Sequence, residues 1–160
     1  MFIGDHGIKG DAGEMLPKSF TEQGLTNMHI PFLFYAPSLL SPKEYSIPVS
    51  QVDVMPSIAA LCNIPYTNTT LGKNVFNTIL QNNNTIFLYD DFNQQIGVLN
   101  NDYYYGYPLK NSQKSLLVSV QNNDKVKNDS MQHTMNILTK TLYETSKYLI
   151  IHNPKNKVKN

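Results

Sequence analysis

The sequence predicts an α/β fold that passes into a small antiparallel sheet and ends in a closing C-terminal helix. Three observations carry this prediction. An apolar run opens the chain and ends in a glycine, four short strand-like runs follow one another between residues 86 and 120, and a long helical segment covers residues 131–149. We expect residues 1–84 to form the α/β part, residues 85–151 the sheet with its helix, and residues 152–160 a flexible tail rich in Lys and Asn.

Length and charge limit the classes of protein to which the chain can belong. With 160 residues it is long enough for one domain with a hydrophobic core. Thirteen basic against twelve acidic residues give a net charge of +1, so we expect no nucleic-acid partner. All of these basic residues are lysines, which excludes a planar arginine clamp on a phosphate or sulfate group. We also expect neither a signal peptide nor a transmembrane segment, because no stretch has the required apolar length.

The first half of the chain contains two predicted strands separated by a long connection. Met1–Ile3 is expected to be the end of a buried strand, with Gly4 allowing the turn that follows. Residues 8–27 are polar and interrupted by glycine and proline, which indicates a long irregular loop. Phe32–Tyr35 is a short apolar run between prolines, which is typical of a fully buried strand.

A helix is predicted to begin at Ser50. Ser50 and Asp53 have the spacing of a capping box, in which each side chain accepts a hydrogen bond from the other residue's backbone N–H. The helix should end near Cys62, which we expect to be an inert core residue. Its predicted buried face consists of Val52, Met55, Ile58, Ala59 and Leu61.

The second half of the chain has the pattern of an antiparallel meander. Asp90-Asp91 and Asn100-Asn101 are typical turn residues between the strand-like runs. Within the run Tyr103-Tyr104-Tyr105, strand alternation predicts that the middle ring is buried and its neighbours are exposed. The predicted strands are residues 86–89, 96–99, 103–107 and 115–120, and the helix that follows has an apolar stripe of Met135, Leu138, Leu142, Thr145 and Leu149.

Asp5 and His6 are the candidate metal ligands. They stand side by side between two glycines, directly after the first predicted strand. In open α/β sheets, ligands bind at the carboxyl ends of strands. A carboxylate oxygen together with an imidazole nitrogen suits Zn²⁺ or Mn²⁺. The alternative is a loop Asp and His that make only local hydrogen bonds.

An ordered set of motifs gives the chain a family resemblance. Gly4-Asp5-His6-Gly7, the segment from His29-Ile30-Pro31 through Phe34-Tyr35-Ala36-Pro37, and Val52-Asp53-Val54-Met55-Pro56-Ser57 occur in this order. The chain resembles the C-terminal portion of sulfatase-family proteins of the alkaline phosphatase superfamily. It is most similar to the lipoteichoic acid synthase and phosphoglycerol transferase type, and the resemblance extends over nearly the whole chain.

The resemblance implies a metal-dependent hydrolase or a phosphoglycerol (or phosphoethanolamine) transferase that acts on a phosphate or sulfate ester, on a lipid headgroup or a sugar. In such enzymes a divalent metal (Mn, Zn or Ca) activates a nucleophile and stabilises the transferring group. Asp5 and His6 match two of the metal ligands. The nucleophile and the other ligands belong to family segments that precede this motif, so we expect weak or no metal binding and no turnover by this chain alone.

Two further residues are candidates for substrate binding. His29 precedes the second predicted strand and could face the site, although a structural role at the strand entry is equally consistent with its position. Lys18 lies in the long loop, where a lysine contacts the substrate anion in some sulfatases; the alternative is a solvated surface lysine.

The resemblance also implies a larger parent protein, anchored in a membrane with its catalytic domain outside the cytoplasm. The expected partner is then the N-terminal portion of the domain. The second hypothesis is a non-catalytic interaction module, or a remnant, that acts only by association with another chain. Exposed edges on the first two strands would promote such association.

Overall fold

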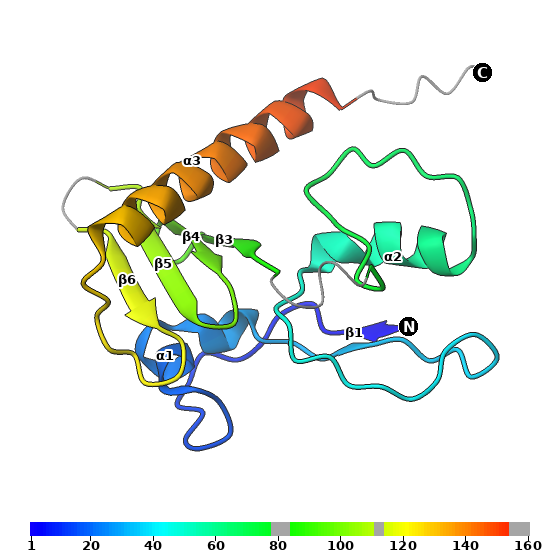
Figure 1. Ribbon diagram of the computed structural model, residues 1–160, viewed down its shortest axis with the longest axis horizontal. Coiled ribbons are helices and arrows are strands. Elements are labelled where there is room, and N and C mark those ends of the chain that lie inside the picture. Colours follow the sequence, from blue (N-terminus) through cyan, green and yellow to red (C-terminus); the bar gives the residue numbers. More distant parts are fainter. Residues whose placement is uncertain (78–83, 111–113, 154–160) are drawn as a thin grey trace.

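The computed structural model describes residues 1–77, 84–110 and 114–153 (Figure 1). It contains helices together with two antiparallel sheets, and a long C-terminal helix. The predicted tail therefore falls, from residue 154 onward, outside the described residues. In the part of the chain that the structure describes, every helix is too short or too polar to span a bilayer.

The second half forms the predicted meander, with strand order β3-β4-β5-β6 and antiparallel pairing throughout. Side chains fix the turns between β3 and β4 and between β4 and β5. Asp90 accepts a hydrogen bond from the backbone N–H of Asn93, and Asn100 accepts one from that of Tyr103 at 2.7 Å. The prediction of these strands is thus confirmed. The strands are β3 (Ile86–Asp90), β4 (Gln95–Leu99), β5 (Tyr103–Pro108) and β6 (Leu116–Ser119).

Both faces of this sheet are covered. Helix α3 (Asp129–His152) crosses one face, where Met135 packs against Tyr105 and its neighbours. On the other face, Leu25 packs against Tyr104 and its neighbours. Tyr104 and Tyr105 are therefore both buried, and the predicted exposure of Tyr105 is wrong because the sheet has no solvent-facing side here. Leu25 belongs to the short helix η1 (Leu25–Met28), which follows α1 (Lys18–Glu22).

The first half is more open than the sequence predicts. Strand β1 (Phe2–Ile3) pairs antiparallel with β2 (Phe32–Leu33), and each strand has two residues. Phe2 is 65% exposed and Leu33 is 54% exposed, so the prediction of buried strands is wrong. The physical reason is that, among the described residues, no helix or sheet covers the side of the ribbon on which the paired Phe2 and Leu33 lie. The long connection also differs from the prediction, because residues 18–28 form α1 and η1 instead of an irregular loop.

The predicted helix begins as a short 3-10 turn, η2 (Gln51–Asp53), and continues as α2 (Val54–Leu61). The capping box between Ser50 and Asp53 is present as predicted. The buried side of α2 is different, however, since Met55 is 56% exposed whereas Ser57 is fully buried. Ser57 faces the segment after residue 71 and accepts a hydrogen bond from the backbone N–H of Val75. Cys62 is exposed, which corrects its predicted place in a core.

Candidate metal-ligand loop and its surroundings

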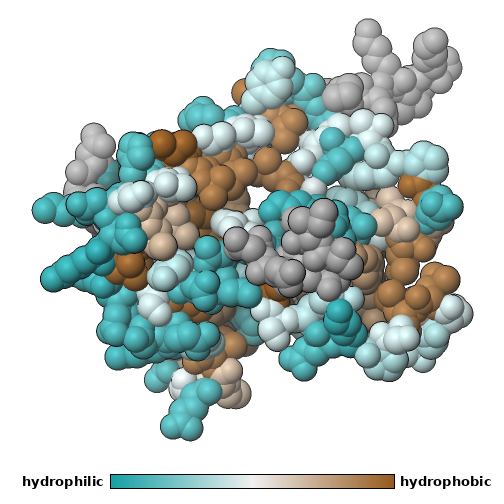
Figure 2. Space-filling view, viewed as in Figure 1, coloured by the Kyte–Doolittle hydropathy of each residue, from teal (hydrophilic) through white to brown (hydrophobic). Residues whose placement is uncertain are grey.

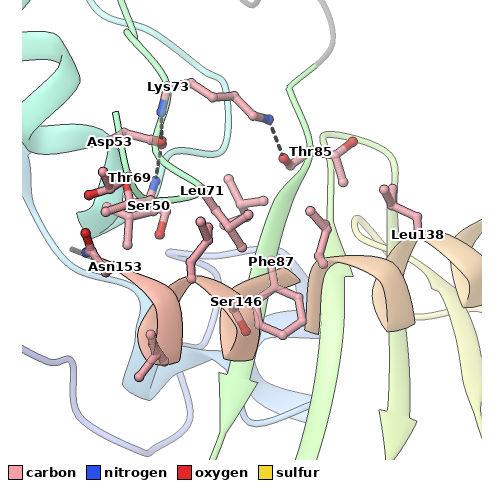
Figure 3. A pocket seen from close by; sticks show the side chains of 16 residues that line it. Ser50, Asp53, Thr69, Leu71, Lys73, Thr85, Phe87, Leu138, Ser146 and Asn153 are labelled. Atoms are coloured by element: carbon pink, nitrogen blue, oxygen red, sulfur yellow. Dashed lines mark hydrogen bonds between the residues drawn. The ribbon is translucent and has the colours of Figure 1, made fainter. Parts of the chain in front are cut away.

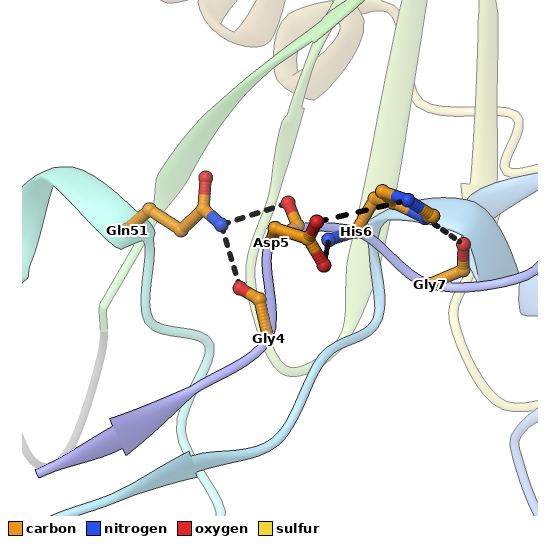
Figure 4. Close-up of polar contacts among 5 residues, drawn as sticks. All are labelled: Gly4, Asp5, His6, Gly7 and Gln51. Carbon is orange, nitrogen blue, oxygen red and sulfur yellow. Dashed lines mark hydrogen bonds and ion pairs between the residues drawn. The ribbon is translucent and has the colours of Figure 1, made fainter.

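The loop Gly4–Gly7, called here the Asp-His loop, is held by its backbone. The N–H of Gly4 donates to the carbonyl of Pro31, and that of Gly7 donates to Asn27 at 2.7 Å. On the other side the amide of Gln51 donates to the carbonyls of Gly4 and Asp5, at 2.8 and 3.0 Å (Figure 4). Segments from three parts of the sequence therefore hold the backbone of the loop. The side chains of Asp5 and His6 take no part in these hydrogen bonds.

Gly7 is required at its position by close packing. A Cβ atom at residue 7 would lie 2.7 Å from the carbonyl oxygen of His29 and even closer to that of Thr26. Real Cβ atoms do not approach backbone so closely, so that only glycine lets η1 lie against the loop. The second glycine of the Gly-Asp-His-Gly motif thus has a steric reason in this fold.

The Asp5 and His6 side chains point into solvent and lie beside each other. Their side chains are 92% and 77% exposed, and Oδ2 of Asp5 lies 3.8 Å from Nε2 of His6. The other ring nitrogen, Nδ1, lies 2.8 Å from the carbonyl oxygen of Gly7, where it can donate a hydrogen bond. This bond leaves Nε2 as the free nitrogen, which is how metal-binding histidines are commonly oriented.

Both side chains have shifted pKa values. The backbone N–H of His6 donates to the Asp5 carboxylate at 2.9 Å and lowers the pKa of Asp5, with the His6 charge adding to the effect. The hydrogen bond to Gly7 and then the Asp5 charge raise the pKa of His6 above its ordinary value. Asp5 is accordingly an anion at neutral pH, and a metal ion at His6 must compete with a proton.

The donor atoms fit part of a metal shell. Metal–ligand distances of about 2.1 Å at a tetrahedral angle place two donor atoms about 3.4 Å apart. The observed 3.8 Å therefore needs only a small side-chain movement for Nε2 and Oδ2 to share one ion. Among the described residues, no group of three or more His, Cys, Asp or Glu side chains gathers at one place. The pair thus supplies two donors of a shell that needs more.

His29 and Lys18, the two predicted substrate ligands, lie in different surroundings. The carbonyl of His29 is close to the Asp-His loop, but its ring packs edge-on against Phe20 with centroids 5.4 Å apart. Lys18 is exposed, and its backbone N–H donates to the carbonyl of Gln121, just after β6. The structure thus brings the His29 backbone to the loop, while Lys18 begins α1 beside the sheet.

Asp53 joins the start of α2 to a segment twenty residues away. It is 3% exposed, and its two carboxylate oxygens accept the backbone N–H groups of Ser50, at 2.8 Å, and Lys73, at 2.7 Å. The sequence predicted only the first of these bonds. Gly72 makes the second one sterically feasible, because a Cβ there would lie 2.6 Å from the carbonyl carbon of Val52.

The Lys73 side chain was not singled out from the sequence. Its Nζ donates to Oδ1 of Asn84 at 2.8 Å and to the carbonyl of Thr85 at 2.9 Å, where β3 is about to begin. Asn84 in turn donates to the carbonyl of Pro48. No local pattern signals this contact, because its partners are distant in sequence and the segment around it has no periodicity. The network ties the first half of the chain to the meander.

Comparisons with known proteins identify no relative of the chain. A scan against protein-family models, a search of curated proteins and a search of solved structures each return no match. The order of the motifs and the geometry of the Asp-His loop are therefore the observations that bear on function.

Proposed function

We propose that this chain is part of a sulfatase-like hydrolase or a phosphoglycerol (or phosphoethanolamine) transferase of the alkaline phosphatase superfamily. Its substrate class is a phosphate or sulfate ester on a lipid headgroup or a sugar. Asp5 and His6 provide two of the ligands of a divalent metal ion, Mn, Zn or Ca. The remaining ligands and the nucleophile come from an N-terminal portion of the domain, in a parent protein anchored in a membrane and facing outside the cytoplasm.

The observation that supports this proposal best is the geometry of the Asp-His loop. Two donor atoms of the right chemistry lie 3.8 Å apart on a backbone held from three sides, and both are open to solvent. The hydrogen bonds of the two side chains are local, to the backbone of His6 and of Gly7, and they leave Oδ2 of Asp5 and Nε2 of His6 available to an ion. When bound, the metal ion would supply Lewis-acid stabilisation of charge on the ester oxygens. Asp5 and His6 would hold that ion, and a hydrogen bond from Nδ1 of His6 to the Gly7 carbonyl would leave Nε2 free for it.

Mn²⁺ titration followed by NMR tests the proposal. Because Mn²⁺ is paramagnetic, even weak binding broadens the signals of nearby residues. We expect broadening centred on Asp5 and His6 that disappears in Asp5→Ala. The matched control is Asp11→Ala, another exposed loop aspartate, which should leave the broadening in place. Broadening spread evenly over the surface carboxylates would refute a metal role for the loop.

The same experiment decides whether the site is incomplete. Two protein donors should give weak binding, because structural and catalytic zinc sites use three or four. Tight stoichiometric binding of Mn²⁺ or Zn²⁺, abolished by Asp5→Ala, would overturn the view that further ligands come from elsewhere.

A second candidate function is an interaction module without catalysis, and the open β1–β2 ribbon favours it. Phe2, Leu33 and Tyr35 are each more than half exposed there, and short strands with free edges promote pairing with another chain. Light scattering after size exclusion tests this candidate. Association that Leu33→Lys abolishes, in a chain that shows no metal-dependent NMR change, would favour the module over the enzyme part.

A further inference from the structure

A cavity of about 390 Å³ opens between α3, the start of β3 and the segment that follows α2. Figure 2 shows that apolar surface gathers along α3 on this side of the molecule. In Figure 3, Leu71, Phe87 and Ser146 converge on the cavity from three different segments. Its wall is mostly apolar and includes Leu71, Ile86, Phe87, Leu138, Leu142 and Leu149.

The size and lining of the cavity suit a ligand with one hydrocarbon chain. Ligand pockets are typically lined by apolar side chains with a few polar groups, and volumes of roughly 300–1,000 Å³ are usual. An apolar cavity of about 150 Å³ holds benzene, so 390 Å³ corresponds to a chain of roughly 12 to 16 carbons. Val52 and Ile150 also line the cavity and are 45% and 79% exposed, so the cavity is open to solvent.

Among the described residues that line the cavity, Lys73 is the cation. Its side chain runs along one end of the cavity, and its Nζ donates to two neutral oxygens, those of Asn84 and Thr85 (Figure 3). Among the described residues no carboxylate forms an ion pair with this ammonium group, and two acceptors leave one of its three N–H groups available. Asp53 also lines the cavity, but both of its oxygens already accept backbone N–H groups.

We propose that the cavity binds an amphiphile with a single acyl chain and an anionic headgroup. The chain lies against the leucine-rich wall, and the headgroup accepts a hydrogen bond from Nζ of Lys73. The site is distinct from the Asp-His loop and does not depend on metal. Charge complementarity at Lys73 distinguishes this ligand from a neutral or cationic amphiphile of the same length.

Calorimetric titration of the full chain with dodecanoate, below its micelle concentration, tests the proposal. We expect saturable one-to-one binding that is about tenfold tighter than that of dodecyltrimethylammonium, which has the same chain and the opposite charge. Octanoate should bind more weakly because it leaves part of the wall uncovered. Equal affinities for the anion and the cation, or no saturation, would overturn the proposal.

Variants locate the site. Lys73→Met should weaken dodecanoate binding about tenfold, whereas Lys127→Met, at an exposed lysine outside the cavity, should not. Should Lys73→Met fail to fold, Ser146→Phe places a ring in the cavity and should abolish binding, with Thr141→Phe on the exposed side of α3 as its control. Equal effects of a variant and its control would refute the site.

Asp5→Ala separates this proposal from the proposed function. It should remove the response to Mn²⁺ and leave dodecanoate binding unchanged. Loss of dodecanoate binding in this variant would refute a site independent of the Asp-His loop, whereas failure of the metal response alone would leave the cavity site standing.

Discussion

Replacing Asp53 by alanine tests whether this carboxylate is a structural link between the two halves of the chain. The side chain is 3% exposed and accepts two backbone N–H groups, from Ser50 and Lys73. Alanine would remove both acceptors and leave two donors without partners at the start of α2. Each hydrogen bond to a charged group contributes about 1.5–3 kcal/mol to stability.

The two bonds together set the expected loss at about 3–4 kcal/mol in the free energy of unfolding. This estimate lies toward the low end of the summed contributions of the two hydrogen bonds. Ser50 and Lys73 are only partly buried, so water can replace part of the lost interaction. A loss of this size is a large fraction of the stability of a typical domain, about 5–15 kcal/mol. Asp53→Asn should lose roughly half as much, since it keeps one good acceptor oxygen but brings an NH₂ group toward an N–H donor.

Urea unfolding followed by far-UV circular dichroism measures these losses. The matched control is Asp129→Ala, which removes an exposed acidic side chain from the first turn of α3. That residue is exposed and lies where an acidic side chain interacts favourably with the helix dipole, so we expect a loss below about 1 kcal/mol. A loss for Asp53→Ala no larger than that for Asp129→Ala would show that the buried carboxylate does not hold the Lys73 segment to α2.

Three further predictions follow from single contacts. Gly72→Ala should lower the unfolding free energy by more than about 2 kcal/mol in the same urea experiment, because its Cβ would clash with backbone atoms. Gly10→Ala is the control: its Cβ would meet nothing within 4 Å, so the substitution should be neutral or slightly stabilising. Asp5→Asn should lower the pKa of His6 measured by NMR, because it removes the charge of Asp5. The hydrogen bond to the Gly7 carbonyl should still keep the pKa of His6 above its ordinary value. An unchanged pKa would show that the Asp5 charge does not act on His6. Burial and then the nearby Asp90 carboxylate raise the pKa of Tyr104, so in an ultraviolet titration its phenol should ionise at higher pH than that of free tyrosine.

The meander and α3 could be predicted from the sequence because their signals are local. In the turns between β3 and β4 and between β4 and β5, side chains bond the backbone within three positions, as those of Asp90 and Asn100 do. The apolar stripe of α3 likewise belongs to one helix, and Met135 and Leu138 pack as expected. The capping box is also a local signal, because it joins Ser50 to Asp53, three residues further along the chain.

Burial in the first half could not be predicted, because it depends on what lies opposite each element. An apolar run such as Phe32–Tyr35 has the composition of a buried strand whether or not a second layer covers it. On α2, the side facing Val75 is buried through Ser57, while the more apolar Met55 faces solvent. The Lys73 contacts join positions more than ten residues apart, and no periodic pattern marks them.

The turn η2, which contains Val52 and Asp53, contacts each of the features described above. Gln51 holds the carbonyls of the Asp-His loop, Val52 lines the cavity, and Asp53 fixes the segment that carries Lys73. Successive residues of a 3-10 turn point in directions about 120° apart, so one short turn can contact three neighbours. A carboxylate at the third position closes the capping box and keeps these three directions fixed. The support that Gln51 gives to the Asp-His loop and the placement of Lys73 beside the cavity thus both involve the turn that the buried Asp53 caps.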